Sequence, residues 1–299
     1  MKIEHTSAET PTVLERVAMR VMGLGSVAEI VAVGQSMIDE NAVEILAHLR
    51  AEHIIDHMRA VYDDTAAIYA ASVQHVHVRP ELIRFVNELS DGDLVLDLGC
   101  GPGRDLWFMA VPNDEYRESL TKAKENADGK MPSIALRVVG VDASSVMCEI
   151  ARGPVNGGEV SARYQPLIAQ RDMHDSEFGE FLRHAMFRGI WSNASFLTHT
   201  PESLVEPVFR SLVHALAPNG LLAMSYTQRT NPLAPYDSLK LSSVGRIKYF
   251  SHPYALDIGQ LARLYGLVSE YHSAHDYIDS RSGQVKKDLF VTQFFRKVR

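Results

Sequence analysis

Residues 95–103 read Val-Leu-Asp-Leu-Gly-Cys-Gly-Pro-Gly, and this stretch decides the fold. An apolar run that contains Asp97 predicts a buried strand with an acidic residue near its carboxyl end. Gly99, Gly101 and Gly103 follow at once, and glycine permits a tight backbone turn and the close approach of a ligand to the main chain. Open α/β sheets bind ligands at such strand ends, where the strand order reverses. The stretch therefore predicts a nucleotide-sized binding crevice.

Short apolar runs alternate with helical patterns on the C-terminal side of this turn. The alternation implies parallel strands that are joined by right-handed crossovers. The last two runs flank the turn Ser282-Gly283 and predict an antiparallel hairpin. The expected fold class is therefore α/β, with a doubly wound and mostly parallel sheet. Strands are expected at residues 94–98, 134–141, 167–169, 189–192, 221–226, 267–275 and 289–295, and helices at 105–110, 144–151, 176–185, 201–216 and 257–265.

The N-terminal part of the chain has a different pattern. Apolar residues recur at three- and four-residue spacing from residue 11 to about residue 71, which predicts helices without strands. We expect residues 1–75 to form a helical N-terminal extension. A further helix that begins at Pro80 leads into an α/β domain over residues 76–299.

Two segments interrupt this α/β domain. Residues 113–132 are polar and rich in charged side chains, so they predict a surface insertion. Residues 227–250 contain prolines and a Ser-Ser pair and predict a long loop. Loops of that length in compact domains often serve as lids over a binding site, so we expect a lid here.

Composition and charge restrict the partners. The formal net charge of -7 and the pI near 6.0 create no field that would draw the chain to phosphate backbones or anionic lipid, so we expect neither nucleic acid nor membrane as a partner. The N-terminus lacks a signal-peptide pattern, and the two cysteines, Cys100 and Cys148, predict no disulfide framework. A cytoplasmic location follows. Because the sequence has no CxxC, HExxH or GxxxxGKS/T pattern, we expect no metal site.

The glycine turn also indicates which ligand it holds. Its spacing, GxGxG, differs from the GxGxxG of dinucleotide-binding sites. Asp97 would repel a diphosphate but would attract a ligand that carries an α-amino group. The stretch therefore favours S-adenosylmethionine (SAM) over a nicotinamide dinucleotide.

With these features, residues 96–103 resemble motif I of the class I SAM-dependent methyltransferases. The resemblance extends over about residues 60–299. It implies a seven-stranded sheet with a reversed C-terminal hairpin, SAM as the cofactor and S-adenosylhomocysteine (SAH) as the product. Residues 76–299 would then be the SAM-binding domain. The helical extension would close over the pocket or form a homodimer interface.

The resemblance also assigns individual residues to the cofactor. Asp142 ends the second strand like the family's ribose ligand, and a carboxylate can accept hydrogen bonds from both hydroxyls of a vicinal diol. Asp172 would contact adenine, although it could instead be an exposed turn residue, and Asp142 could be a helix cap. Tyr62 and Tyr69 would cover the cofactor or simply pack. The cofactor-binding set is Tyr62, Tyr69, Asp97, Gly99, Cys100, Gly101, Gly103, Asp142, Ala143, Met147, Asp172, Met173, Ser192, Asn193 and Ala194.

On the acceptor side, His199, Tyr226 and His252 are the candidate catalytic residues. Methyl transfer is an in-line displacement, so the protein chiefly aligns the acceptor and excludes water, and a general base is needed only for a nucleophile that must lose a proton. His199 could instead help to start the helix that follows it. The resemblance implies transfer to an O, N or C atom of a small molecule, and residues 246–252 resemble methyltransferases of bacterial secondary metabolism.

Other functions remain alternatives. One is a SAM-binding or regulatory protein without activity, in which the N-terminal helices form a dimer interface. Another is an NAD(P)-dependent oxidoreductase, which would need a diphosphate close to Asp97. The last is a protein or RNA methyltransferase that binds its substrate through basic residues such as Arg296, Lys297 and Arg299.

Overall fold

A computed structural model of the chain describes residues 50–74, 80–111, 132–156, 163–231, 236–241, 246–278 and 285–298. The helices expected before residue 50 lie outside the described residues. So do nearly all of the 113–132 insertion and the turn Ser282-Gly283.

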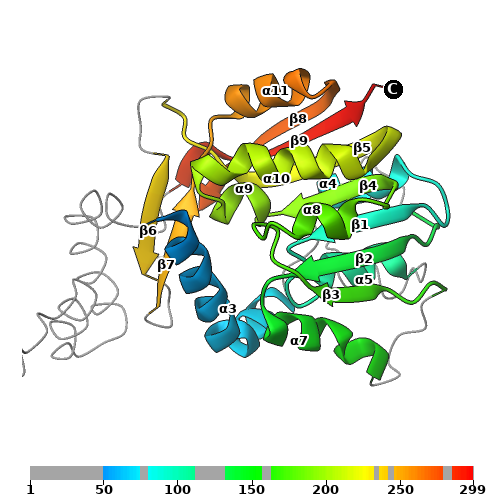
Figure 1. The fold of residues 1–299 in the computed structure, drawn as a ribbon, viewed down its shortest axis with the longest axis horizontal. Helices are drawn as coiled ribbons and strands as arrows, with labels where there is room; N and C mark the ends of the chain where they lie inside the picture. The colour runs from blue at the N-terminus through cyan, green and yellow to red at the C-terminus, as the bar shows by residue number, and fades with distance from the viewer. Residues whose placement is uncertain are drawn as a thin grey trace, which may run out of the picture.

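A seven-stranded sheet forms the centre of the molecule, in the order β3-β2-β1-β4-β5-β9-β8 (Figure 1). The first five of these strands run parallel, and β9 pairs antiparallel with both β5 and β8. This arrangement confirms the predicted fold class and the C-terminal hairpin. The strands are β1 (Leu94–Leu98), β2 (Arg137–Asp142), β3 (Leu167–Gln170), β4 (Phe187–Asn193), β5 (Leu216–Thr227), β8 (Leu267–Ile278) and β9 (Val285–Lys297).

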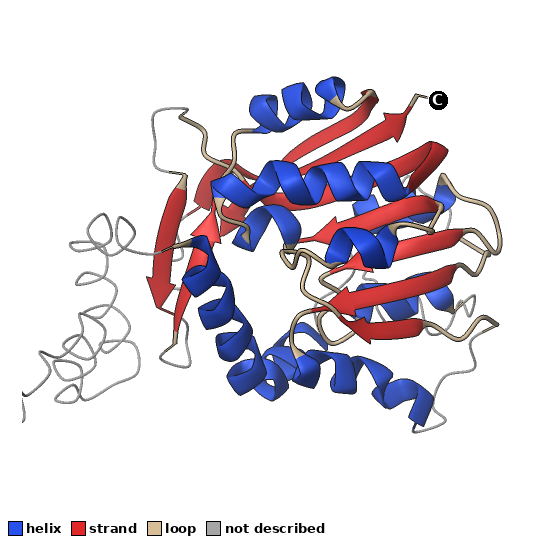
Figure 2. Cartoon of the chain, in the orientation of Figure 1, coloured by secondary structure: helices blue, strands red, loops and turns tan. Residues whose placement is uncertain are grey.

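Helices cover both faces of this sheet (Figure 2). Alternation along each strand explains why two cores form, since Leu96 and Leu98 of β1 face one helix layer and Val95 faces the other. The first layer contains α8 (Phe178–Leu182), α9 (Phe196–His199), α10 (Glu202–Ala215) and α11 (Ala255–Leu264), and the second contains α4 (Pro80–Asn87), α5 (Arg104–Ala110) and α7 (Ser145–Asn156).

The segment expected to be a long loop, residues 227–250, contains a hairpin instead. Its strands β6 (Asp237–Leu241) and β7 (Ile247–Ser251) form a separate antiparallel sheet. β6 alternates polar and apolar side chains from Ser238 to Leu241, and this period of two predicts a strand, whereas Phe250 interrupts the alternation in β7. The prolines and serines around the strands concealed that signal.

Helix α3 (Ala51–Gln74) lies across the carboxyl ends of the parallel strands, between α7 and the β6–β7 hairpin (Figure 1). Ile54 and Met58 of this helix pack on Leu239 and Tyr249 of the hairpin. The ring of His57 is hydrogen-bonded to the backbone oxygen of Ile247 at 2.7 Å. Near the middle of the helix, Asp63 accepts a 2.6 Å hydrogen bond from the Ser144 hydroxyl, just before α7. Helix α3 therefore contacts both the β6–β7 hairpin and the α/β domain that contains the seven-stranded sheet.

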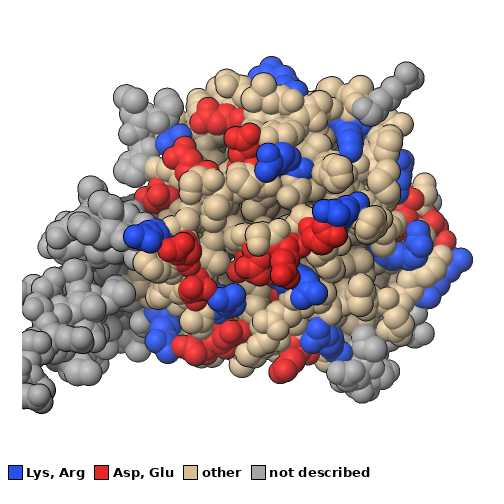
Figure 3. Space-filling view, viewed as in Figure 1, with Lys and Arg blue, Asp and Glu red and all other residues tan. Residues whose placement is uncertain are grey.

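The surface carries both signs of charge. On the face shown in Figure 3, acidic and basic side chains of the described residues are interspersed. None of the described helices is long and apolar enough to span a membrane.

Candidate functional site

The glycine turn after β1 has the backbone geometry that the sequence predicts. Gly99 has φ of +71° and Gly101 has φ of +52°. Both values lie in the left-handed backbone region, which residues other than glycine seldom adopt. A Cβ on Gly99 would lie 1.7 Å from Oγ of Ser195. Position 99 therefore excludes any side chain, whereas position 101 favours glycine through its backbone conformation alone.

Asp142 stands beside this turn because β2 pairs parallel with β1, so that the two strand ends meet. Its Oδ2 accepts from the backbone N–H of Gly101 and its Oδ1 accepts from that of Ser144, both at 2.9 Å. The carboxylate is thereby held in one orientation. A carboxylate offers about four acceptor positions, so each oxygen keeps one for a ligand hydroxyl.

Asp97 is buried, with 2% of its surface exposed, and its Oδ2 has no hydrogen-bond partner among the described residues. Burial raises the pKa of this carboxyl group well above its usual value, and the nearby carboxylates of Asp105 and Asp142 raise it further. Oδ1 of Asn193 is a second buried acceptor without a described partner, and its amide N–H donates to Asp105 at 3.0 Å. A ligand with a cationic hydrogen-bond donor would satisfy the buried acceptors of both Asp97 and Asn193.

Asp172, which follows β3, has one oxygen engaged and one available. Its Oδ1 accepts from the backbone N–H of His174 at 2.9 Å and from ring Nδ1 at 2.8 Å. Burial alone would raise the pKa of Asp172, but the hydrogen bonds and charge of His174 and the charge of Arg59 lower it. Oδ2 is buried without a described hydrogen-bond partner, 3.8 Å from an Arg59 nitrogen. It is the third buried acceptor of the site without a described hydrogen bond.

These residues line two cavities that share five wall residues, among them Tyr69 and Asn193. Most of the residues expected to bind the cofactor line one or both cavities. They are Tyr62, Tyr69, Asp97, Gly99, Cys100, Gly101, Asp142, Ala143, Met147, Asp172, Met173, Asn193 and Ala194, together with the acceptor-side candidate His199.

Two of the residues expected to bind the cofactor make contacts within the protein instead. Ser192 is buried and its hydroxyl accepts from the backbone N–H of Phe196 at 3.1 Å. Gly103 precedes α5, and a Cβ there would lie 3.1 Å from Cβ of Ala151 on α7. Neither is among the residues that line the cavities.

His199 is held in one tautomer. Its Nδ1 lies 2.9 Å from the backbone oxygen of Tyr249, which can only accept, so Nδ1 carries the proton. Nε2 therefore accepts from the hydroxyl of Tyr62 at 2.8 Å. Burial lowers the pKa of His199 to about 4, and the charges of Lys248 and Lys240 act in the same direction. The imidazole is neutral at physiological pH.

The structure places the other two acceptor-side candidates away from the cavity walls. Tyr226 faces the core because of strand alternation in β5, and its buried hydroxyl donates to Gln293 at 2.5 Å. His252 connects the hairpin to β5, since its ring nitrogens lie 3.0 Å from Oγ1 of Thr227 and 2.8 Å from Oγ of Ser238. Neither residue is among those that line the two cavities.

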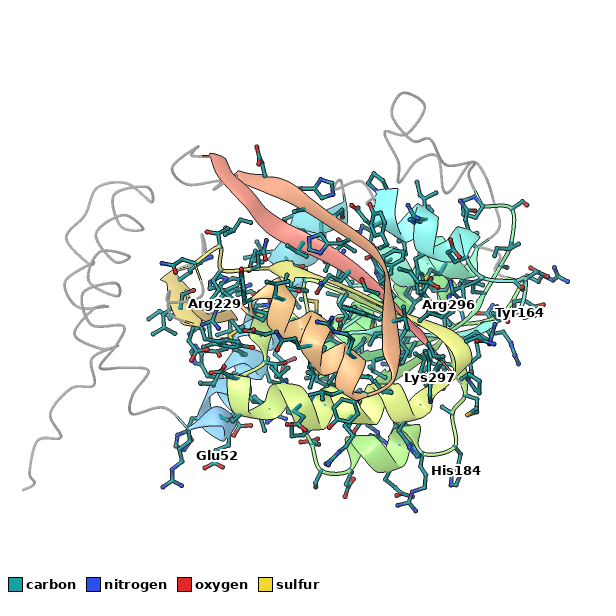
Figure 4. The ribbon with its side chains drawn as sticks, turned by 90° about the horizontal axis from the view of Figure 1, so that it is seen from above. Glu52, Tyr164, His184, Arg229, Arg296 and Lys297 are labelled. Carbon is teal, nitrogen blue, oxygen red and sulfur yellow. The ribbon has the colours of Figure 1, made fainter. Side chains whose placement is uncertain are left out.

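The basic residues considered for RNA binding have intramolecular partners. Lys297 donates to the backbone oxygens of Val213 and Leu216, and Arg296 pairs with Glu88 and Glu270. Figure 4 shows Arg296 and Lys297 at the opposite end of the sheet from Arg229, which follows β5. Arg296 and Lys297 therefore lie far from the carboxyl ends of the parallel strands. Arg299 lies outside the described residues.

Sequence reasoning missed several cavity residues. Arg104 and Asp105 open α5 directly after the glycine turn, and their position in the motif could have indicated them. No local pattern indicates the α3 residues, since their role depends on where that helix packs. The missed residues are Ile55, Met58, Arg59, Val73, Pro102, Arg104, Asp105, Ser144, His174 and Ser195. No group of three His, Cys, Asp or Glu side chains in the described ranges could hold a metal ion.

No protein-family model matches the sequence, and no curated protein does. Solved structures do match. A SAM-dependent methyltransferase from Methanosarcina mazei has 13% identity and a TM-score of 0.54, over 75% of this chain and 99% of that one. The 1,6-didemethyltoxoflavin-N1-methyltransferase of Burkholderia thailandensis, solved with 1,6-didemethyltoxoflavin and SAH, has 14% identity and a TM-score of 0.55, over 84% and 92%.

The cyclase SpnF is also similar, with 14% identity and a TM-score of 0.53, over 80% of this chain and 95% of that one. At such identities the likeness concerns the fold. The chain has the fold of the class I SAM-dependent methyltransferases, with the seven-stranded, mostly parallel sheet and the reversed C-terminal hairpin that the sequence predicted. Since a cyclase shares this fold, the reaction must be argued from the site.

Proposed function

We propose that the chain is a SAM-dependent methyltransferase that acts on a small molecule. The observation that carries this proposal is the set of three buried acceptor atoms without a described hydrogen-bond partner, on Asp97, Asn193 and Asp172, the last of which also lies 3.8 Å from an Arg59 nitrogen. SAM has N–H donors at both of its ends, an α-ammonium group and an adenine amino group. The ammonium group would satisfy Asp97 and Asn193, and the amino group would satisfy Asp172.

Other residues of the site match the ribose, the adenine ring and the carboxylate of SAM. Asp142, fixed by Gly101 and Ser144, would accept from both ribose hydroxyls, and Ala143 and Met147 would contact adenine. Arg104 lines the Asp97 cavity and would hold the cofactor's carboxylate. A diphosphate, in contrast, would lie among Asp97, Asp105 and Asp142, which argues against a nicotinamide dinucleotide.

When bound, SAM would supply an electrophilic methyl group on a positively charged sulfur. The protein's own contribution is to orient the acceptor and to exclude water. Tyr62, Tyr69 and the hairpin would form the cover, with α3 as the lid of the helical extension. This cover leaves a confined space beside His199, which suits a small molecule better than a folded macromolecule.

The decisive experiment is calorimetric titration of the full chain with SAM, SAH and NAD. We expect SAM and SAH to bind and NAD not to bind. Asp142→Asn should weaken SAH binding by roughly 10- to 100-fold, because it weakens hydrogen bonds made to a charged acceptor. The exposed Asp175→Asn is the matched control. A preference for NAD, or no binding of SAM and SAH, would exclude the proposal.

Turnover, and not the titration, separates the main alternative. A regulatory or otherwise inactive SAM-binding protein would bind SAH and respond to Asp142→Asn, but would not convert SAM to SAH with any acceptor. Turnover assays with a panel of small acceptors therefore follow the binding measurement.

A further inference from the structure

Tyr69 on α3 lies where the two cavities of the candidate site meet. The described walls that both cavities share are Tyr69, Gly99, Gly101, Asn193 and Ala194. Two of these residues are glycines and one is an alanine, so Tyr69 and Asn193 present the longer side chains to this junction. Of the two, Tyr69 is the one that has an aromatic ring.

The proposed cofactor would place its sulfur at this junction. Asp142 and Asp172, assigned to ribose and adenine, line one cavity but not the other. Asp97 and Arg104, assigned to the amino-acid part, line the other cavity but not the first. The sulfur of SAM is the atom that joins adenosine to the amino-acid part. It would therefore lie beside the shared walls, and so beside the ring of Tyr69.

Neighbouring groups hold the Tyr69 ring over the glycine turn. A Cβ on Gly101 would lie 4.0 Å from a ring carbon of Tyr69, which is an ordinary van der Waals distance. The rings of Tyr69 and Tyr62 are nearly perpendicular, at 82°, and their centroids lie 5.9 Å apart. A side chain that is already packed loses little conformational entropy when a ligand binds. The ring is therefore well placed to contact an atom at the junction.

The charges around Tyr69 favour a positively charged atom there. Burial raises the pKa of Tyr69, the charge of Arg104 lowers it, and the charges of Asp105 and Asp142 raise it further. Asp142 lines one cavity and Asp105 lines the other. Arg104 is paired with Asp105 at 2.7 Å. A cation at the junction would thus lie between two carboxylates, one on each side.

Lys248 shows that the two tyrosine rings already attract a cation. Its Nζ lies 4.3 Å from the ring centroid of Tyr62 and 5.5 Å from that of Tyr69. Lys248 lines neither cavity, so its ammonium group does not occupy the space that the cofactor's sulfur would take. Because Tyr69 itself lines both cavities, part of its ring stays available to a ligand.

We propose that the ring of Tyr69 contacts the sulfonium of SAM and so makes the site bind SAM more tightly than SAH. This inference rests on the proposed function, since it concerns the same site. An aromatic face attracts a cation, and the attraction is stronger where water is excluded. SAH has the same adenosine and amino-acid groups, but its sulfur is uncharged. A preference of this kind would limit inhibition by the product.

The test titrates the full chain by calorimetry with SAM, SAH and sinefungin, which carries an ammonium group in place of the methylated sulfur. We expect the wild type to bind SAM and sinefungin more tightly than SAH. Tyr69→Leu keeps an apolar side chain but removes the ring. It should lower the affinities of SAM and sinefungin relative to SAH about fivefold or more. Tyr69→Phe retains the ring and should keep both ratios.

Further variants make the outcome specific. Tyr254 is a half-buried tyrosine that lines neither cavity, so Tyr254→Leu should leave all three affinities unchanged. If Tyr69→Leu does not fold, Tyr69→Met replaces it. Ratios that stay at the wild-type value without the ring would overturn the inference and leave the proposed function intact. So would a fall in the SAM ratio alone, because it would assign the preference to the methyl group. If neither SAM nor SAH binds the wild type, the proposed function fails and the inference fails with it.

Discussion

The hydroxyl of Tyr62 on α3 lies 2.8 Å from Nε2 of His199 on α9, 137 residues further along the chain. Because the Tyr249 backbone oxygen fixes the proton on Nδ1, Tyr62 is the donor in this bond. Burial also raises the pKa of Tyr62 well above its usual value, so the hydroxyl keeps its proton. One hydrogen bond thus connects α3 to the segment that follows β4.

Tyr62→Phe should therefore destabilise the fold. The substitution leaves Nε2 of His199 buried without a donor, which costs about 1–3 kcal/mol. Urea unfolding of the wild type and the variant measures the difference. Tyr69→Phe is the control, since the Tyr69 hydroxyl has no hydrogen-bond partner among the described residues. Equal losses in both variants would show that the Tyr62 hydrogen bond contributes nothing of its own.

The neutral state of His199 should make stability depend on pH. Burial lowers its pKa from 6.5 to about 4 in the folded chain, so the unfolded chain binds more protons between these values. The contribution of His199 is therefore fully present above about pH 6.5 and is lost as the pH falls toward 4. His199→Gln should flatten this part of the stability profile, whereas the exposed His184→Gln should not. Thermal unfolding across pH 4–7 tests the difference.

Binding of the cofactor should be coupled to the ionisation of Asp97. Its pKa is raised by burial and by neighbouring carboxylates, and an ammonium group beside it would favour the charged form. SAH should therefore bind more weakly as the pH falls, with proton release in the range where Asp97 is protonated. Calorimetry in buffers of different ionisation enthalpy measures that release.

5′-Methylthioadenosine provides the control for this linkage because it lacks the α-ammonium group. Its affinity should not depend on the ionisation of Asp97. Asp97→Asn should weaken SAH binding and remove the proton release, with little effect on 5′-methylthioadenosine. If both ligands lose affinity equally in this variant, Asp97 does not contact the ammonium group.

Two glycines should respond in opposite directions to alanine. Gly99→Ala places a methyl group 1.7 Å from Oγ of Ser195 at a φ of +71°, so the free energy of unfolding should fall by about 2–4 kcal/mol. Gly259 lies in α11 with no atom of another element within 4 Å of its absent Cβ, so Gly259→Ala should raise it by about 0.5–1 kcal/mol. Denaturant unfolding of both variants tests the contrast. A stable Gly99→Ala variant would contradict the close approach of Ser195.

The sheet could be predicted from sequence because its signals are local. The strand at Leu94–Leu98 begins and ends where the pattern predicts, and the alternation of strands and helices fixed the parallel core. The β6–β7 hairpin was missed, since its strands are short and turn-forming residues surround them. β2 begins at Arg137 rather than residue 134, because an apolar run does not distinguish a strand from the buried segment that precedes it.

The residues of the candidate site likewise fall into two groups, those that local sequence signals predict and those that depend on tertiary packing. Gly99, Asp142 and Asp172 follow strand ends, so the parallel sheet alone brings them together. Tyr226 lies one position from the end of its strand, and a change of one position moves a side chain from the cavity edge to the core. Lys248 reaches the tyrosines only through tertiary packing of the hairpin on α3. No spacing in the sequence encodes that contact.

The position of β9 has a consequence for synthesis. It lies inside the sheet, between β5 and β8, although it is the last strand of the described chain. A nascent polypeptide that ends at residue 278 would have both neighbours of β9 but not the strand that joins them. Each would expose a row of unpaired backbone groups, and such edges associate with other chains. The protein should therefore depend on chaperones until β9 has emerged from the ribosome.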